Sequence, residues 1–177
     1  MDNVDRAITM SFKKINSKIF MIGQRKDELG GSLYYNLFGE LGVNVPSPDL
    51  NEVKDQIYAI TDCIDNKLIE SCHDISDGGI AVALSEMTFE NNIGCSVNIP
   101  GILSVEKLLF SETGGFIIEV EDSKTKNVNE IFNKHNINLE LIGETCKDQK
   151  LVVNNAINME VEEMKSLWTN GLREKIK

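Results

Sequence analysis

At 177 residues, the chain is long enough to fill one hydrophobic core, and its length favours one domain over two. Hydrophobic residues make up 41% of the chain and charged residues 26%, with only three prolines, which excludes a fibrous or largely disordered protein. The formal net charge of −10, without any dense run of Lys or Arg, argues against nucleic acid or an anionic membrane as the main partner, because both require concentrated positive charge.

No stretch approaches the roughly 18 consecutive apolar residues of a membrane span, and the first residues are too polar for a signal peptide. We therefore expect a cytoplasmic protein. The four cysteines include no Cys-x-x-Cys pair, and neither histidine stands at a spacing suited to zinc. We expect reduced, mostly buried thiols at Cys63, Cys72, Cys95 and Cys146.

The first part of the chain carries one clear strand signal. Helical spacing is weak over residues 1–17, whereas the β-branched and aromatic residues of 18–23 predict a strand. A double-glycine turn then leads to residues 33–38, an apolar stretch whose pattern does not distinguish helix from strand.

The strongest helix signal comes next. Asp49 is a good N-cap, Glu52 completes a capping-box pattern, and apolar residues follow at helical spacing, so a helix is predicted over 49–66. A short extended run at 67–73 and an amphipathic helix at 78–91 come after it.

The rest of the chain mixes both kinds of element. The pattern predicts strands at 95–99, 116–120, 139–144 and 150–153, and helices at 103–109, 125–136 and 159–177. Neighbouring strands near the end are tightly connected. This favours an α+β fold, in which helices cover a layered mixed sheet, over a strictly alternating parallel sheet.

Residues 69–91 join an extended run to a helix through two carboxylates and two glycines. Such a junction leaves backbone N–H groups pointing along the helix axis, and Gly78 and Gly79 let a phosphate approach without meeting a Cβ. Asp74 and Asp77 would repel a bare phosphate. We therefore interpret the junction as a site for a nucleotide phosphate bridged by a divalent cation.

The same residues also have ordinary structural explanations. An aspartate or Ser76 could cap the following helix, and the glycines could simply permit close helix packing. Gly30-Gly31-Ser32 could be an ordinary tight turn. His73 is better explained as a partly buried, hydrogen-bonded histidine than as a base, and Glu112 as a surface turn carboxylate than as a substrate contact.

Three segments together resemble one family: Glu28-Leu-Gly-Gly-Ser-Leu-Tyr, the stretch from His73-Asp-Ile-Ser-Asp-Gly-Gly to residue 87, and Leu109-Phe-Ser-Glu-Thr-Gly-Gly. In order and separation they look like the C-terminal domain of the phosphoribosylformylglycinamidine synthase family. The resemblance runs over nearly the whole chain. It implies that residues 1–177 form a single C-terminal domain of a larger enzyme, with the fold of the aminoimidazole ribonucleotide synthetase C-terminal domain.

The resemblance implies a ligase that uses ATP and Mg²⁺ to convert an amide to an amidine with ammonia from a glutaminase subunit, in a complex that also contains a small accessory subunit. The main ATP-binding and catalytic residues of the family lie in upstream domains, so the chain alone should not complete the reaction. By resemblance to long-form members of the family, Asp74 binds Mg²⁺ and Ser76 contacts ATP or ADP at a second, structural site. The geometric argument adds Gly78 and Gly79 to the nucleotide site.

The chain departs from the family pattern at two places. Leu33 stands where the family usually has an acidic residue, and Gly114-Gly115-Phe116 stands where it has an arginine, a natural bidentate partner of phosphate. Two alternatives therefore stay open: a non-catalytic interaction or scaffolding domain, and the C-terminal domain of a related enzyme such as aminoimidazole ribonucleotide synthetase. A homodimer of the isolated domain would cover a sheet face that a neighbour normally buries.

Overall fold

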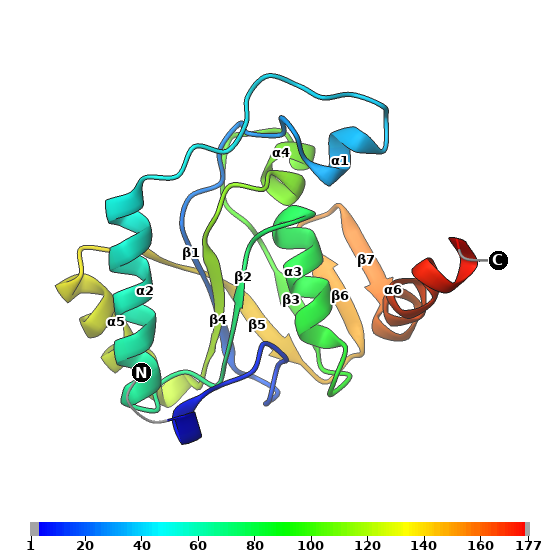
Figure 1. The fold of residues 1–177 in the computed structure, drawn as a ribbon. Coiled ribbons are helices and arrows are strands. Elements are labelled where there is room, and N and C mark those ends of the chain that lie inside the picture. The colour runs from blue at the N-terminus through cyan, green and yellow to red at the C-terminus, as the bar shows by residue number, and fades with distance from the viewer. Residues whose placement is uncertain (1–3, 176–177) are drawn as a thin grey trace.

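The structure is a computed structural model that describes the backbone of residues 4–175 and the side chains of residues 4–171. It confirms the α+β fold, with one curled, mixed sheet of seven strands covered by helices (Figure 1). The strands are β1 (Lys18–Ile22), β2 (Ser71–Asp74), β3 (Gly94–Val97), β4 (Phe116–Val120), β5 (Leu139–Cys146), β6 (Lys150–Val153) and β7 (Ile157–Glu160). The helices are α1 (Leu33–Asn36), α2 (Leu50–Asp65), α3 (Gly79–Thr88), α4 (Val105–Phe110), α5 (Thr125–Lys134) and α6 (Val161–Lys175).

The strands lie in the order β2-β4-β1-β5-β3-β6-β7. All neighbouring pairs are antiparallel except β3 and β6, which run parallel. Strands that are distant in sequence therefore lie side by side. The order brings the end of β2 next to the start of β4, where Asp74 pairs with Phe116.

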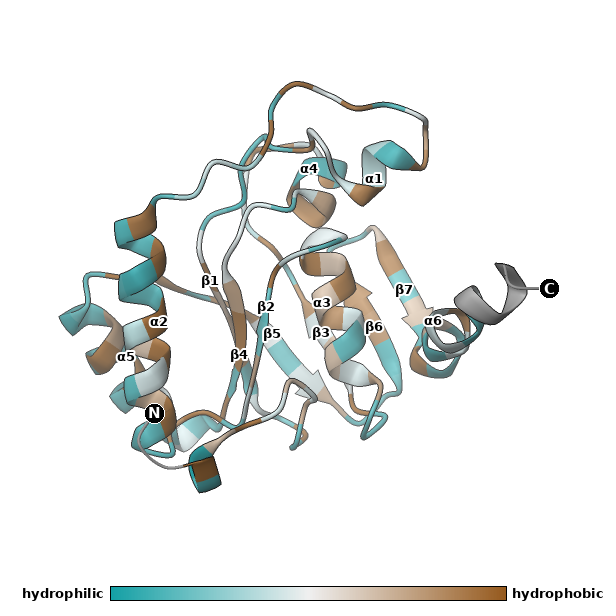
Figure 2. Ribbon diagram, viewed as in Figure 1, coloured by the Kyte–Doolittle hydropathy of each residue, from teal (hydrophilic) through white to brown (hydrophobic). Residues whose placement is uncertain are grey.

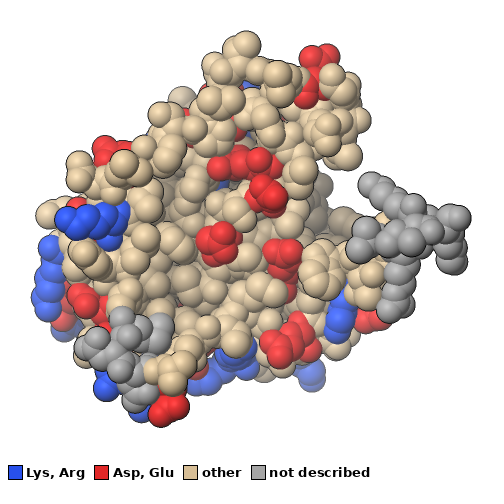
Figure 3. All heavy atoms as spheres, in the orientation of Figure 1, with Lys and Arg blue, Asp and Glu red and all other residues tan. Residues whose placement is uncertain are grey.

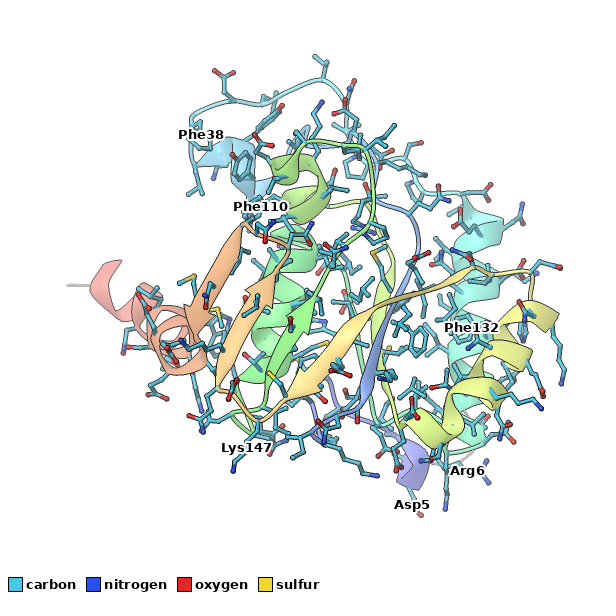
Figure 4. All side chains as sticks on the ribbon, turned by 180° about the vertical axis from the view of Figure 1, so that it is seen from behind. Asp5, Arg6, Phe38, Phe110, Phe132 and Lys147 are labelled. Atoms are coloured by element: carbon cyan, nitrogen blue, oxygen red, sulfur yellow. The ribbon has the colours of Figure 1, made fainter. Side chains whose placement is uncertain are left out.

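Alternating side chains of the strands point to opposite faces of the sheet, and each face forms a hydrophobic core with the helices that cover it. In β1, Ile19 and Met21 point toward α3 and α6, whereas Phe20 and Ile22 point toward α2 and α5. Phe132 of α5 is fully buried in the second core (Figure 4). The ribbons of α2 and α5 show bands of both hydropathies, as expected for helices with one solvent face, whereas α3 is mostly hydrophobic (Figure 2).

The predicted helix over 49–66 is confirmed as α2. One carboxylate oxygen of Asp49 accepts hydrogen bonds from the N–H groups of Asn51 (2.8 Å) and Glu52 (3.3 Å), so it caps the helix. Glu52 does not complete the capping box, because its side chain accepts from Gln56 instead (3.1 Å). The ambiguous stretch 33–38 forms the short helix α1, which Ser32 caps by accepting from the Tyr35 N–H.

Two boundary predictions need correction. The helical spacing over 1–17 yields only a short 3-10 turn at Val4–Arg6, and residues 1–3 lie outside the described part of the chain. The segment after the turn is held by other contacts instead: the buried Glu119 carboxylate accepts the N–H groups of Lys13 (2.8 Å) and Lys14 (2.9 Å). The helix predicted over 78–91 begins at Gly79 and ends at Thr88.

The sheet edge also differs from the prediction. β7 was not predicted, because four residues that alternate only twice carry little periodic signal. The helix predicted over 159–177 begins after it, and its last two residues lie outside the described range. Val161 and Met164 are buried as the apolar stripe predicted, but Leu167 and Trp168 are exposed. Within the described part of the chain, no helix combines the length and apolar character that crossing a bilayer requires.

Candidate functional site

The β2–α3 junction is a tight turn whose backbone is largely used by the protein itself. The N–H of Ile75 donates to Gly115 O (2.8 Å), and the N–H of Gly79 donates to Ser76 O (2.9 Å). Gly78 is the N-cap of α3, with a φ of 78° in the left-handed region, and no side chain caps the helix. Neither Ser76 nor Asp77 is therefore the capping residue that the structural alternative proposed.

Glu112 holds this junction from the loop between α4 and β4. Its Oε1 accepts hydrogen bonds from the N–H of Gly78 (2.9 Å) and from the N–H of Leu33 (2.8 Å). A carboxylate at a helix N-terminus is favoured by the partial positive charge there. The carboxylate of Glu112 therefore occupies the position at which the sequence predicted a phosphate. Glu112 connects the three motifs, so it is more than a surface turn residue.

The neighbours of Glu112 fasten the same loop to residues 25–28. Ser111 Oγ donates to Lys26 O (2.6 Å) and accepts from the N–H of Glu28 (3.1 Å). Thr113 Oγ1 donates to Glu28 Oε2 (2.7 Å). The three motifs that carry the family resemblance therefore meet at one end of the sheet through hydrogen bonds between residues far apart in sequence.

Arg25 is a buried cation in this arrangement that the sequence reasoning missed. Its guanidinium donates to Gly114 O (2.6 Å) and to Ser111 O (3.4 Å), and an ideal Cβ on Gly115 would lie 3.1 Å from its Nη2. Burial lowers the pKa of Arg25 to about 10, although nearby Glu28 acts in the opposite direction. An arginine does therefore lie against the Gly114-Gly115 loop, but it comes from the segment after β1.

The glycines of the junction are required for packing and backbone conformation. An ideal Cβ on Gly79 would lie 2.6 Å from Leu109 O, so this glycine lets α3 pack closely on α4. A Cβ on Gly78 would collide with the Val82 side chain. Gly30 has a comparable role, since its Cβ would lie 2.7 Å from the backbone of Asn44.

His73 is the partly buried, hydrogen-bonded histidine that the sequence predicted. Its Nδ1 lies 3.2 Å from Asp74 Oδ1, and its Nε2 lies 2.8 Å from Glu86 Oε2. The other oxygen of Glu86 accepts from Trp168 Nε1 (3.1 Å), which links α6 to the same group. His73 thus holds one oxygen of Asp74 from the side.

Two carboxylates of the predicted metal site, those of Asp74 and Asp77, are exposed to solvent. The Asp74 side chain is 61% exposed, and Ser76 and Asp77 are also exposed. Acidic side chains gather on this face over the β2–α3 region (Figure 3). Among the described residues, however, no three His, Cys, Asp or Glu side chains form a group that could hold a metal ion. These residues could supply only part of the ligand set of Mg²⁺. Mg²⁺ often binds in this way, through one or two carboxylates together with substrate phosphates and water.

An exposed apolar segment lies beside this end of the molecule. Tyr34 of α1 stacks on Phe110 of α4 (centroid distance 4.8 Å) and meets Phe38 edge-on (5.2 Å); Figure 4 shows both phenylalanines at the α1–α4 end. The large exposed side chains of the segment are Leu33, Leu37, Phe38, Leu41, Val43 and Val45. Contiguous apolar surface of this kind commonly marks an interaction surface.

Comparison with known proteins places this arrangement among relatives. The family model of AIR synthase related protein, C-terminal domain, matches residues 14–154. The phosphoribosylformylglycinamidine synthase subunit PurL of Methanothrix thermoacetophila is 36% identical over 184 residues, which cover 98% of this chain and 23% of that protein. The chain thus spans about a quarter of the length of the curated relatives it matches.

Solved structures share the fold. Thermotoga maritima PurL in complex with FGAR matches with a TM-score of 0.78 at 17% identity, over 92% of this chain and 30% of that one. The PurLQS structure from the same organism matches with a TM-score of 0.75 at 19% identity, over 92% of this chain and 28% of that one. Further matching structures of the Thermotoga maritima protein are complexes with AMPPCP, ADP and ATP.

Proposed function

The chain belongs to the family of AIR synthase related proteins, C-terminal domain, and from this membership we propose that it acts as the single C-terminal domain, residues 1–177, of an ATP-dependent phosphoribosylformylglycinamidine synthase. That enzyme converts formylglycinamide ribonucleotide to its amidine in purine biosynthesis, with ammonia derived from glutamine. The observation that carries the proposal is the 36% identity to a synthase subunit over 98% of the chain. Upstream domains, a glutaminase subunit and a small accessory subunit would complete a cytoplasmic complex.

The domain would supply one side of a nucleotide site. Asp74 offers an exposed carboxylate to Mg²⁺, and Ser76 offers a hydroxyl to a phosphate. Gly78 and Gly79 leave room at the turn, while the N–H of Gly78 stays with Glu112. The bound Mg²⁺ would neutralise phosphate charge beside Asp74 and Asp77. The exposed apolar segment 33–45 supports a location against another domain, since water would otherwise cover its side chains.

Calorimetric titration of Mg²⁺–ADP tests the shared site. We expect the 177-residue chain alone to bind weakly or not at all, and the chain assembled with the upstream part of the subunit to bind at least about tenfold more tightly. Asp74→Asn should remove that gain, whereas Asp77→Asn, which changes the same charge in the same turn, should retain most of it. Equal and tight binding with and without the upstream part would refute a shared site.

One observation favours a second function, a pure interaction module. The N–H of Gly78, which a phosphate at the junction would use, already donates to the carboxylate of Glu112. On this alternative, Asp74→Asn in the complete subunit would alter stability or assembly and leave its nucleotide content unchanged. Loss of nucleotide from a variant that still assembles would count against the interaction module and support the nucleotide site.

A further inference from the structure

A second concave site lies away from the β2–α3 junction. A cavity of about 670 Å³ opens between the segment following β1, the loop before α4 and the turn from α5 to β5. Its volume lies in the range of small-molecule sites, about 300 to 1,000 Å³. None of residues 74–79 lines it, so it is separate from the proposed nucleotide site. Any ligand here would be independent of that function.

The cavity wall combines an apolar floor with polar groups. Met21, Leu108 and Ile137 are buried side chains of the lining, and Gln24, Asn136 and Asn138 add amide groups. Apolar walls with a few directed polar groups are the usual lining of a site for a small organic molecule.

Arg25 is positively charged, so a molecule bound beside it is expected to carry a negative charge. Arg25 is one of the residues that line the cavity, and it is only 8% exposed. The two Nη atoms donate to carbonyl groups of the 111–114 loop, and Nε, on the other edge of the guanidinium, is buried without a hydrogen-bond partner. Among the described side chains, no carboxylate forms an ion pair with this guanidinium. The guanidinium donates only to neutral carbonyl groups, and nearby Glu28 offsets just part of the desolvation cost of this buried cation, since burial remains the larger effect on its pKa. An anion in the cavity would offset more of that cost.

We infer that this cavity binds a small organic anion, a phosphate monoester or carboxylate with an apolar or aromatic body, whose acid group lies against Arg25. Lys26 lines the same cavity and adds a second positive charge, while Glu52 and Glu140 on the lining disfavour a large polyanion. Nε is shielded from solvent, so a direct bond to it requires a small rotation of the Arg25 side chain or of the cavity wall. The apolar floor then covers the body of the ligand.

Amide chemical-shift mapping of the 177-residue chain tests the inference with three probes. Phenyl phosphate and benzoate carry the acid group on an aromatic body, and benzyl alcohol is the neutral analogue. We expect the two anions to shift the amides of 24–26 and 136–138 with a Kd of about 1 mM, and benzyl alcohol to bind about tenfold more weakly. Inorganic phosphate, which lacks the apolar body, should also bind more weakly than phenyl phosphate.

Matched variants separate binding from folding. Arg25→Gln should weaken phenyl phosphate at least about tenfold. Because Arg25 also holds the 111–114 loop, Asn138→Trp fills the cavity without touching those bonds and should abolish the shifts. Asn133→Trp, an exposed asparagine on α5 outside the cavity, is its control. Glu140→Gln removes a repulsive charge and should tighten binding of the anions.

The outcomes decide the inference. Localised shifts that require the acid group and disappear in Asn138→Trp but persist in Asn133→Trp would support it. Equal binding of benzyl alcohol and phenyl phosphate would overturn the role of the charge. Shifts confined to other residues, or none up to about 20 mM of either anion, would overturn the site.

Discussion

Replacing Glu112 by alanine tests whether the hydrogen bonds of this carboxylate hold the three motifs together. The change removes the acceptor of the Gly78 N–H, which belongs to a buried residue, and of the Leu33 N–H at the exposed start of α1. A hydrogen bond to a charged group contributes about 1.5–3 kcal/mol when buried and less when exposed to water. We assign about 2 kcal/mol to the Gly78 bond and about 0.5–1 kcal/mol to the Leu33 bond, so Glu112→Ala should lower the free energy of unfolding by about 2–3 kcal/mol.

Urea unfolding followed by circular dichroism measures this loss, which should correspond to a Tm lower by about 5–10 °C in a chain of this size. Glu112→Gln keeps an oxygen acceptor and should lose only about 1 kcal/mol. Glu90→Ala removes an exposed glutamate 4.0 Å from Lys13 and should cost less than about 0.5 kcal/mol. In Glu112→Ala, hydrogen exchange should accelerate at both amides that donate to Glu112, those of Gly78 and Leu33. If the Glu112→Ala protein were as stable as the Glu90→Ala control, with both amides still protected, the conclusion that Glu112 holds the three motifs together would be refuted.

Three further predictions follow from other contacts. Gly79→Ala adds a Cβ 2.6 Å from a backbone carbonyl at a φ of 68°, so it should cost about 2–4 kcal/mol, whereas Gly114→Ala, which meets open space, should be nearly neutral in the same urea assay. Hydrogen bonds from Lys124 and Lys14 lower the pKa of Glu121 to about 2. The contribution of these bonds to folding stability is fully present above the ordinary pKa near 4.5 and is lost as pH falls toward 2. Glu121→Gln should therefore flatten the acid limb of a plot of stability against pH, and an unchanged acid limb would contradict this prediction. Mass spectrometry after iodoacetamide treatment at pH 8 should find Cys146 alkylated first, because burial raises the pKa of the other three thiols more strongly, and first alkylation at any of those three would be inconsistent with their burial.

Much of the architecture could be predicted because its signals are local. The cap at Asp49 and the helical spacing behind it lie within one short window, as do the β-branched runs of β1 and β4. The same local content supported the family resemblance, since each motif is a short run of residues. Where the window was short or mixed, as in α1 and β7, the prediction was ambiguous or absent.

The candidate site could be predicted only in part. Asp74, Ser76 and Asp77 lie together and exposed at the turn, as the sequence indicated, and His73 is hydrogen-bonded beside them. Their proposed ligand roles stay predictions. The sequence indicated an anion at the start of α3, and the structure places the carboxylate of Glu112 there, a group that could not be deduced from residues 69–91 alone.

By itself, the sequence determined the α+β class, most of the elements and the family, since periodicity, caps and motifs need only neighbouring residues. Only the tertiary structure decided that Glu112 meets Gly78 and Leu33, which lie 34 and 79 residues away. It also decided that Arg25 stands beside Gly114 and is part of the lining of a cavity. Those contacts depend on strand order and register, and many registers satisfy the same hydrophobic pattern until the whole sheet has been packed against its helices.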